Sequence, residues 1–279
     1  MTPSASAAES HELFEQNYNR QYFLSQEKKF RERYQNHWKR RIEIIFKMIR
    51  SLPLSGKRVL DLGSSIGTYT IEFALRGYQA TGIDLSSLAV EKAQQLALEH
   101  HAEAQFRVGD ITQKYHFPAG TFDLIYAGDI IEHLLPDALD QTLAHCRYWL
   151  KEGGYFVYHT VPLKYDIVFH KSPLWWLLIP FVPFPEKVFK AAVQSVYRLY
   201  DRLYFMKHGI GYIKKQESMV HCNLQTKNGF RETLKKNGFK SIQQTLVTTE
   251  PRFFYGIKKK LFSKKEDYLK DLFGVAQAS

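Results

Sequence analysis

Cysteine is scarce in this 279-residue sequence, and the sequence has no apolar run long enough to span a membrane. The two cysteines, Cys146 and Cys222, fit no metal-binding spacing and are too few for a disulfide framework, which favours a reducing compartment. The longest nearly uncharged apolar run, residues 173–185, is short and contains Pro180 and Pro183. The N-terminus lacks the charged start and apolar stretch of a signal peptide. We therefore expect a cytoplasmic protein and leave peripheral membrane contact open.

Acidic residues are too few to balance the basic ones, and the formal net charge is +11. The excess is uneven. Residues 163–216 carry nine Lys or Arg against three Asp or Glu, and five more lysines lie within residues 258–265. Such an excess indicates either an anionic partner or a solvated basic face with a basic tail, and composition alone does not choose between them.

The spacing of apolar residues predicts an α/β protein. Between residues 26 and 50, apolar side chains recur every three or four positions, which predicts one amphipathic helix. From residue 58 to 162, short apolar strands alternate with helical segments, and this alternation is typical of a parallel sheet covered on both faces. We predict a doubly wound, mostly parallel, seven-stranded sheet with N-terminal helices and an inserted helical cap.

The alternation stops after residue 162. Residues 163–216 hold twelve aromatic residues and a helical pattern from about Glu186 to Phe205, and we interpret them as the cap. A further helix and two strands, at 241–250 and 252–259, are then predicted to form an antiparallel pair at the sheet edge. The predicted organisation is a tail and helical flank, a core, the cap, the C-terminal part of the core sheet, and a basic tail, at residues 1–52, 53–162, 163–216, 217–258 and 259–279.

Aspartates stand at the ends of four successive predicted strands. They are Asp61, Asp84, Asp110 and Asp129. An Asp at a strand end is often a turn former or helix cap, so any one of them alone is weak evidence. Because ligands of open parallel sheets bind beyond the carboxyl ends of the strands, four acids in register predict a ligand site there.

The loop after the first strand has too little glycine for a dinucleotide site. Such a site needs three glycines so that pyrophosphate can approach bare backbone, whereas here only Gly63 and Gly67 are present, separated by Ser64, Ser65 and Ile66. The acid before the loop suits a cation better than a phosphate. A cofactor with a positively charged amino-acid end and no phosphate fits this loop best.

With these residues the sequence resembles the class I S-adenosylmethionine (SAM)-dependent methyltransferases. The resemblance runs from about residue 59 to 162 and again over 221–239. The family's first motif, an acid followed by Gly-x-Gly-x-Gly, is present as Asp61, Gly63, Ser65 and Gly67, with Ser in place of the middle glycine. The resemblance implies the cofactor SAM, with S-adenosylhomocysteine as product.

The resemblance also assigns roles around the cofactor. It implies that Asp84 takes the ribose hydroxyls, that Asp110 and Ile111 border the adenine, and that Asp129 lies beside the methionine portion. The residues predicted to bind the cofactor are Asp61, Gly63, Ser64, Ser65, Gly67, Asp84, Leu85, Asp110, Ile111 and Asp129.

The segment 128–137, GDIIEHLLPD, follows the fourth strand and resembles a segment of the O-methyltransferases of ubiquinone biosynthesis. If Asp129 begins a helical turn, Glu132 and His133 lie on its side of that turn. His133 is then a candidate general base for an acceptor hydroxyl. The alternatives are that Asp129, Glu132 and His133 hold a divalent metal, or that Glu132 and His133 only brace the loop. We expect no metal requirement.

Two further histidines are candidate catalytic residues. His159 ends the fifth strand, and His221 with Asn223 resembles a His-x-Asn element that precedes the last helix in many relatives. A lone histidine is more often a structural residue than a catalyst. Tyr18 and Tyr22 either close over the cofactor or anchor the N-terminal arm, and we favour the anchor.

The sequence predicts a methyltransferase that acts on a small molecule. We expect the acceptor to be an oxygen of a hydrophobic, aromatic or lipid-linked metabolite beneath the cap, because residues 173–185 of the cap offer almost only apolar atoms, among them Trp175, Trp176, Phe181 and Phe184. Nitrogen or carbon methylation of a natural product, or a polar sugar-type acceptor, remains the alternative. The Asp-Ile-Ile-Glu sequence after the fourth strand argues against a nucleic-acid amino-methyltransferase and a nucleic-acid partner.

Overall fold

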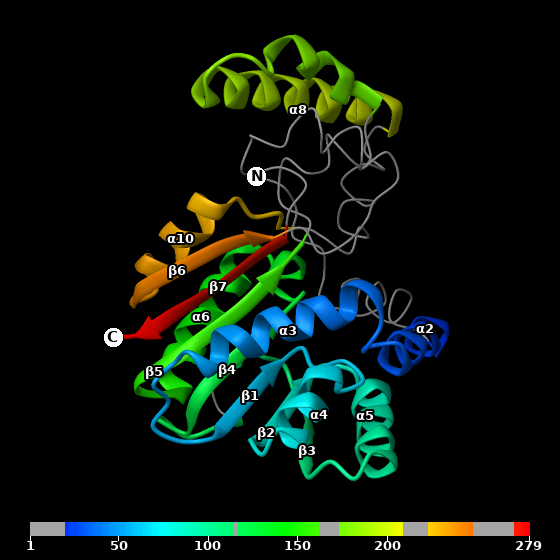
Figure 1. Cartoon of the computed structure of the whole chain (residues 1–279), viewed down its shortest axis with the longest axis vertical. Helices are drawn as coiled ribbons and strands as arrows, with labels where there is room; N and C mark the ends of the chain where they lie inside the picture. The colour runs from blue at the N-terminus through cyan, green and yellow to red at the C-terminus, as the bar shows by residue number, and fades with distance from the viewer. Residues whose placement is uncertain (1–19, 114–115, 162–172, 209–222, 248–270) are drawn as a thin grey trace.

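A seven-stranded sheet with the strand order β3-β2-β1-β4-β5-β7-β6 forms the centre of the molecule (Figure 1). The computed structural model describes residues 20–113, 116–161, 173–208, 223–247 and 271–279. The first five strands in the chain pair in parallel, and β7 runs antiparallel to both of its neighbours. The predicted fold class is therefore confirmed. The strands are β1 Arg58–Leu62, β2 Gln79–Asp84, β3 Ala104–Val108, β4 Phe122–Gly128, β5 Leu150–Thr160, β6 Phe239–Val247 and β7 Asp271–Ala278.

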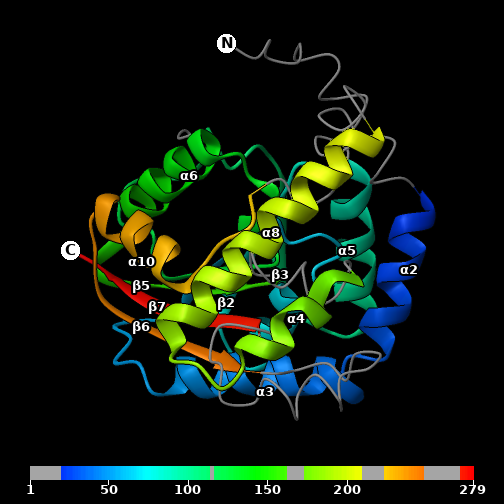
Figure 2. The same cartoon turned by 90° about the horizontal axis from the view of Figure 1, so that it is seen from above.

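Helices cover both faces of this sheet (Figure 2). On one face α6 and α10 pack over the strands, and on the other α3 packs against β1, β4 and β7. Helices α2, α4 and α5 share a further apolar cluster next to it. These helices are α2 Arg20–Arg31, α3 Asn36–Arg50, α4 Thr68–Leu75, α5 Ser87–Glu99, α6 Pro136–Trp149 and α10 Lys227–Lys236, and a short 3-10 turn, η2, covers Ile131–His133.

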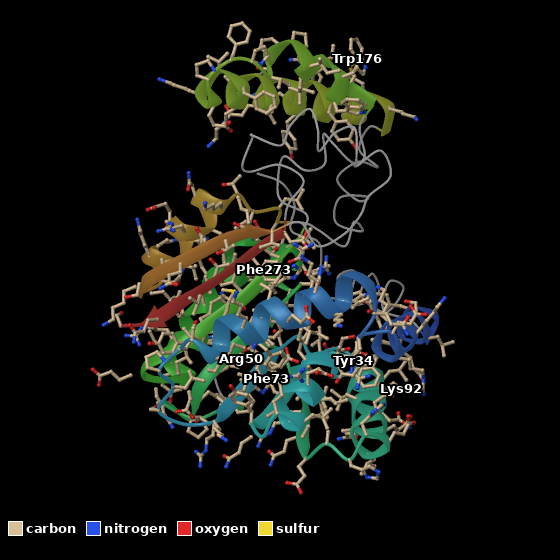
Figure 3. All side chains as sticks on the ribbon, in the orientation of Figure 1. Tyr34, Arg50, Phe73, Lys92, Trp176 and Phe273 are labelled. Atoms are coloured by element: carbon tan, nitrogen blue, oxygen red, sulfur yellow. The ribbon has the colours of Figure 1, made fainter. Side chains whose placement is uncertain are left out.

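The N-terminal flank is two helices rather than the single helix predicted for residues 26–50. The chain leaves α2 at Arg31 and enters α3 at Asn36. Between them Arg33 turns inward, and its Nε donates to Glu72 Oε1 of α4 at 2.7 Å. Tyr34, labelled in Figure 3, donates to the same carboxylate oxygen at 2.6 Å. The prediction was wrong because a buried polar contact with a distant helix interrupts a pattern that is locally helical.

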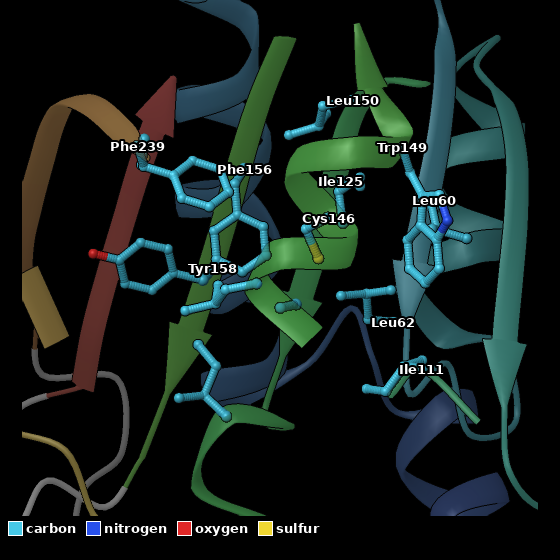
Figure 4. Packing of buried hydrophobic residues seen from close by; sticks show 14 of the residues in the cluster. Leu60, Leu62, Ile111, Ile125, Cys146, Trp149, Leu150, Phe156, Tyr158 and Phe239 are labelled. Atoms are coloured by element: carbon cyan, nitrogen blue, oxygen red, sulfur yellow. The ribbon is translucent and has the colours of Figure 1, made fainter. Parts of the chain in front are cut away.

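The larger core cluster lies between the sheet and α6 (Figure 4). Leu60 of β1 and Phe156 of β5 meet Cys146 and Trp149 of α6, and each of these side chains is at most 1% exposed. Burial of a large apolar side chain of this kind contributes roughly 2–3 kcal/mol to stability. The sheet is thus held rigidly, so the ends of β1, β2 and β4 have fixed positions.

The last strand corrects the predicted tail at residues 259–279. Residues Asp271–Ala278 form β7, which lies between β5 and β6 and is almost wholly buried. The strand predicted at 252–259 lies outside the described residues. We missed β7 because a lysine-rich stretch precedes it and because its apolar residues serve both faces of the sheet, which removes the polar–apolar alternation.

The described part of the cap is a 3-10 helix, η3 Pro173–Phe181, followed by α8 Glu186–His208. The predicted cap helix is confirmed and extends a little beyond Phe205. Buried Leu178, Phe189 and Val193 give this pair a small apolar cluster of its own. The cap lies on the side toward which β1 and β5 point (Figure 1). Among the described helices, none combines the length and apolar character needed to cross a membrane.

The position of β7 can be tested at Gly274, which pairs with Tyr158 of β5. A Cβ at this position would overlap the ring of Tyr158. We expect Gly274→Ala to lower the free energy of unfolding by about 1–3 kcal/mol, the usual cost of overpacking. The cost should largely disappear in a Tyr158→Ala background, where the ring is absent. Denaturant unfolding of the four proteins measures this coupling, with exposed Leu98→Ala on α5 as the control. Equal effects in both backgrounds would contradict the placement of β7.

Candidate functional site

A cavity of about 330 Å³ opens at the carboxyl ends of β1, β2 and β4. It falls within the size range of small-molecule sites. Its wall combines strand ends, the loop after β1, the turn η2 and the two N-terminal helices. The lining residues are Tyr22, Phe23, Gln26, Lys29, Trp38, Asp61, Gly63, Ser64, Ser65, Ile66, Thr68, Tyr69, Asp84, Leu85, Gly109, Asp110, Ile111, Gly128, Asp129, Ile130, His133 and Leu134.

The predicted cofactor-binding residues gather at this cavity with one exception. Gly67 is absent from the lining; it has a φ of 82° and begins α4 instead. Gly63 also has a positive φ, of 60°, and a Cβ there would come within 2.6 Å of Ile130 Cδ1. Ser65 occupies the middle position with a φ of 49°. The loop therefore needs glycine at its two ends for conformation and space, whereas its middle position accommodates a serine.

Asp84 is fixed by the loop that it faces. Its Oδ2 accepts from the backbone N of Ser65 at 2.8 Å, and its Oδ1 accepts from Ser86 N at 2.9 Å. Burial raises the pKa of Asp84, and the two backbone donors partly oppose that shift. The side chain thus links the first two strand ends directly and presents a carboxylate to the cavity.

Asp61 is the most deeply buried of the predicted cofactor-binding acids. Its Oδ2 accepts from Thr70 Oγ1 at 2.6 Å. Burial raises the pKa of Asp61 to about 7, although the Thr70 hydroxyl opposes the shift. A cationic ligand group in the cavity would favour the ionised form of this carboxyl and would be bound more tightly as a result.

Asp110 has a local role as well as a place in the cavity wall. Its Oδ1 accepts from the backbone N of Thr112 at 2.9 Å and from the Thr112 hydroxyl at 2.7 Å. It is therefore a turn former in the structure, and it lines the cavity together with Ile111. The turn-forming contact is thus present, and the predicted place of Asp110 beside the cofactor remains a prediction.

The N-terminal helices supply a wall of the cavity, of which the sequence analysis named only Tyr22, as an alternative. Tyr22, Gln26 and Lys29 lie at intervals of four and three along α2 and line the cavity, as does Trp38 of α3. Burial and the nearby charges of Asp84 and Asp129 raise the pKa of Tyr22 to about 12. Tyr22 is therefore part of the cavity wall and not only an anchor. The helical spacing of these polar and aromatic residues is the signal that could have revealed this wall.

Asp129 follows β4 with a left-handed backbone, at a φ of 53°. Its Oδ1 lies 2.7 Å from Nδ1 of His159, and its Oδ2 lies 3.5 Å from Nη1 of Arg41. Burial alone would raise the pKa of Asp129, but the charges of His159 and Arg41 hold it well below its usual range. Asp129 is thus an anion in the cavity wall with two cationic groups beside it.

His159 stands behind this carboxylate rather than in the cavity. Its side chain is fully buried, and it is absent from the cavity lining. A buried imidazole already paired with Asp129 cannot reach an acceptor hydroxyl, so the direct catalytic role predicted for His159 is not what the geometry shows. His221, the third predicted catalytic histidine, and Tyr18 lie outside the described residues.

Glu132 and His133 diverge, although the sequence placed them on one side of a turn. His133 lines the cavity, whereas Glu132 is fully buried and accepts from Thr160 Oγ1 at 2.8 Å. Burial and the charge of Asp129 raise the pKa of Glu132 to about 8. The backbone N of Asn223 donates to the carbonyl oxygen of Glu132 at 3.0 Å. Glu132 therefore braces the turn.

The alternative metal set of Asp129, Glu132 and His133 is consequently not assembled. Across the part of the chain that the structure describes, no cluster of three His, Cys, Asp or Glu side chains could hold a metal ion. The cavity lining also includes no described cap residue from 173–208. The wall opposite the strand ends comes from α2 and α3 instead.

Comparison with known proteins agrees with the resemblance read from the loop. Residues 59–154, less than half of the chain, match the model of a family described as a methyltransferase domain. The resemblance of the core to methyltransferases is therefore confirmed over these residues.

Two curated relatives that match part of this chain are named for different methyl-transfer reactions. A ubiquinone biosynthesis O-methyltransferase of Chromobacterium violaceum is 31% identical over 112 residues, which are 40% of this chain and 47% of that protein. Phosphoethanolamine N-methyltransferase 3 of Arabidopsis thaliana is 26% identical over 121 residues, 43% of this chain and 23% of that protein. The chain thus spans less than half the length of these relatives.

Solved structures share the fold at low identity. Phosphoethanolamine N-methyltransferase 2 of Haemonchus contortus, solved with phosphomonomethylethanolamine and S-adenosylhomocysteine, has a TM-score of 0.62 at 16% identity, covering 100% of this chain and 61% of that one. The PH0226 protein of Pyrococcus horikoshii OT3 has a TM-score of 0.55 at 18% identity, covering 89% and 96%. These likenesses show the Rossmann-like fold.

Proposed function

We propose that this protein is a SAM-dependent methyltransferase that acts on a small molecule. The observation that carries the proposal is the cavity at the strand ends, where Asp61, Asp84, Asp110 and Asp129 meet the Gly63–Gly67 loop within the segment that matches a methyltransferase domain.

The residues present fit the cofactor. A carboxylate-rich wall suits a ligand with a cationic amino-acid end, and the absence of a third glycine in the loop disfavours a pyrophosphate. Asp84 would bind the ribose hydroxyls, Ile111 would border the adenine, and Asp129 would face the methionine portion. When bound, SAM supplies an electrophilic methyl group on a positively charged sulfur. The protein's own task is then to orient the acceptor, exclude water and remove a proton.

His133 is the residue that we propose as the general base. It lines the cavity close to Asp129 along the chain, and histidine is the side chain that most often transfers protons in catalysis. A base of this kind is needed for a hydroxyl acceptor, and this supports O-methylation. Relatives named as O- and N-methyltransferases both match the chain, so methylation of nitrogen stays the alternative.

We further propose a hydrophobic or aromatic acceptor that contacts the N-terminal helices rather than the cap. Tyr22, Phe23 and Trp38 of the N-terminal helices and Tyr69 of α4 give the cavity an aromatic side, and Leu134 adds an aliphatic one. Flat aromatic side chains suit a planar ring or an isoprenoid group. In this proposal the N-terminal helices contact the acceptor, and the cap binds the lipid surface in which the acceptor is dissolved.

The cap's surface supports a contact with anionic lipid. Its exposed apolar side chains, here called the apolar cap set, are Trp176, Ile179, Phe181, Phe184, Val188, Leu199, Leu203 and Met206. Trp176 is labelled on the cap in Figure 3. Residues 173–208 also carry five Lys or Arg against two Asp or Glu, which gives charge complementarity to an anionic surface. A lipid-linked acceptor would be concentrated at such a surface.

Cofactor binding tests the proposal first. We expect calorimetry to detect SAM and S-adenosylhomocysteine binding to the intact protein. Asp84→Ala should raise both dissociation constants about tenfold to a hundredfold, because it removes charge-assisted hydrogen bonds that contribute roughly 1–3 kcal/mol. Asp140→Ala, on α6 and paired with Lys236, is the matched control and should bind normally. If the wild-type protein binds neither compound, the proposed function is wrong.

The base assignment predicts that His133→Ala lowers kcat by about 10²–10⁴-fold at neutral pH, the usual contribution of a positioned base. Binding of S-adenosylhomocysteine should change little, which separates this effect from a lost cofactor site. The control is His101→Asn, because His101 is exposed and Asn tolerates its left-handed backbone at a φ of 53°. Unchanged turnover in His133→Ala would exclude His133 as the general base. Loss of activity in EDTA with recovery in Mg²⁺ would instead indicate that a bound metal ion is required.

The lipid contact predicts co-sedimentation with vesicles that contain anionic phospholipid, weaker at high salt. The double variant Trp176→Ser, Phe184→Ser should lose most of this binding, since it removes two exposed aromatic side chains. The matched control is Leu98→Ser, which removes a side chain that is 77% exposed on α5 of the core. Equal vesicle binding by both variants would contradict a lipid contact through the apolar cap set. A preference for a charged water-soluble acceptor, without vesicle binding by the wild type, would contradict it as well.

A further inference from the structure

Four charged side chains meet behind the cavity wall, and they come from four different elements. Arg41 of α3 lies with its Nη2 3.2 Å from Asp271 Oδ2 at the start of β7, and its Nη1 lies 3.5 Å from Asp129 Oδ2. His159 of β5 lies with Nδ1 2.7 Å from Asp129 Oδ1 and Nε2 3.4 Å from Asp271 Oδ2. We call Arg41, Asp129, His159 and Asp271 the buried charge network.

Counted over these four side chains, the charges balance when the histidine is protonated. The side chains of Arg41, His159 and Asp271 are at most 4% exposed, while that of Asp129 is 32% exposed at the cavity. With a neutral imidazole the same four side chains would carry one net negative charge in a largely buried place, which is unfavourable. An imidazolium at His159 restores the balance. The chain therefore uses His159 as a counter-ion.

The same contacts immobilise Asp129. Both of its carboxylate oxygens face a cationic group, and its backbone N donates to the carbonyl oxygen of His159 at 3.0 Å. Its left-handed φ of 53° is an uncommon conformation that surrounding contacts must maintain. The residue is thus held by backbone and side chain from one side and open to the cavity on the other.

We propose that His159 and Asp271 are positioning residues: through the buried charge network they fix the orientation and the negative charge of Asp129 toward the cationic amino-acid portion of the cofactor. Arg41 extends this network to α3, the helix that also brings Trp38 to the cavity. The proposal rests on the proposed function, because it names what holds a group of that cofactor site.

A second buried ion pair provides a natural comparison. Arg33 and Glu72 join the same N-terminal flank to α4, with Nε and Oε1 2.7 Å apart and both side chains at most 5% exposed. Neither residue lines the cavity or contacts Asp129 in the described structure. A variant of this pair should therefore lose stability in the same way without disturbing the orientation of Asp129.

The charge of His159 gives the network a pH signature. Burial lowers the pKa of His159, but the charge of Asp129 and bonds to Asp129 and Asp271 outweigh it and raise the pKa to about 9. The positive charge of Arg41 on α3 opposes the rise in the pKa of His159. The carboxyl of Glu132 on η2 also interacts with His159, and the ring of Phe273 lies 4.5 Å from the imidazole.

The sign of the effect follows from linkage. Since the folded pKa is above the unfolded value of about 6.5, the stabilisation is complete below about pH 6.5 and is lost as the pH rises through about 9. The raised pKa of Glu132 also makes the free energy of unfolding fall with rising pH, and this fall ends near pH 8. Burial also raises the pKa of the Cys146 thiol, which adds a decline of the same sign from about pH 9, so the part of the decline that belongs to His159 is the part that His159→Gln removes.

The experiment compares wild type, His159→Gln, Asp271→Asn and Arg33→Gln by thermal unfolding of the ligand-free protein from pH 6.5 to 9.5 and by calorimetry with S-adenosylhomocysteine at pH 7. We expect His159→Gln and Asp271→Asn each to raise the dissociation constant about tenfold, as when a charge-assisted contact is lost. His159→Gln should also lose the decline in Tm between pH 8 and 9.5. Arg33→Gln should have a lower Tm but keep that decline and the wild-type dissociation constant.

Each outcome decides the question. Wild-type affinity in both network variants, or an unchanged pH dependence in His159→Gln, overturns the proposal. An equal loss of affinity in Arg33→Gln reduces it to a general effect of stability and overturns it too. If His159→Gln does not fold, Asp271→Asn, which keeps the side-chain volume, carries the affinity test. If wild type binds no S-adenosylhomocysteine, the proposed function and the positioning role both fail, whereas the pH dependence of Tm still reports whether His159 is charged.

Discussion

The compensation of buried charge behind Asp129 is the constraint that joins the parts of this molecule. A carboxylate at the wall of a cavity needs cations at its back, and here they come from α3 and β5, while β7 supplies the second carboxylate that balances them. Because an unpaired charge in this place would be very costly, the position of the N-terminal helix and the order of the last three strands depend on each other. The first helical flank and the final strand, about 230 residues apart along the chain, are thus parts of one arrangement.

The features that the sequence could predict are local ones. Asp61 and Asp84 end short apolar strands, and in a parallel sheet such ends meet at one edge, so their proximity follows from secondary structure alone. Arg41 and Asp271 are different. Arg41 looks like one more basic residue of an amphipathic helix, and Asp271 ends a charged stretch, so only tertiary pairing shows that both are buried. The same reason explains the split between α2 and α3, where a contact with Glu72 overrides a helical pattern.

The loop after β1 shows why the serine in its middle position is compatible with the proposed site. Gly63 and Gly67 have left-handed backbones with a neighbouring side chain where a Cβ would lie, so both positions require glycine. Ser65 also has a positive φ, of 49°, but its backbone N donates to Asp84, which ties the position in place. This hydrogen bond between the loop and the end of β2 stabilises a backbone conformation that glycine would adopt at little cost and that serine adopts less readily.

The division between matched and unmatched segments determines where selectivity for the acceptor must be sought. Residues 59–154 carry the acids and the loop, whereas Tyr22, Lys29 and Trp38 lie outside them and form the opposite side of the cavity. The relatives that match part of this chain are named for different reactions, one as an O-methyltransferase of ubiquinone biosynthesis and one as a phosphoethanolamine N-methyltransferase, so the shared part does not identify an acceptor. The choice must come from walls that vary around a common centre. In this chain α3, which forms part of the opposite wall, is tied to Asp129 through Arg41, so under the proposed function the group that helps to hold Asp129 would also set the distance between the cofactor and the acceptor.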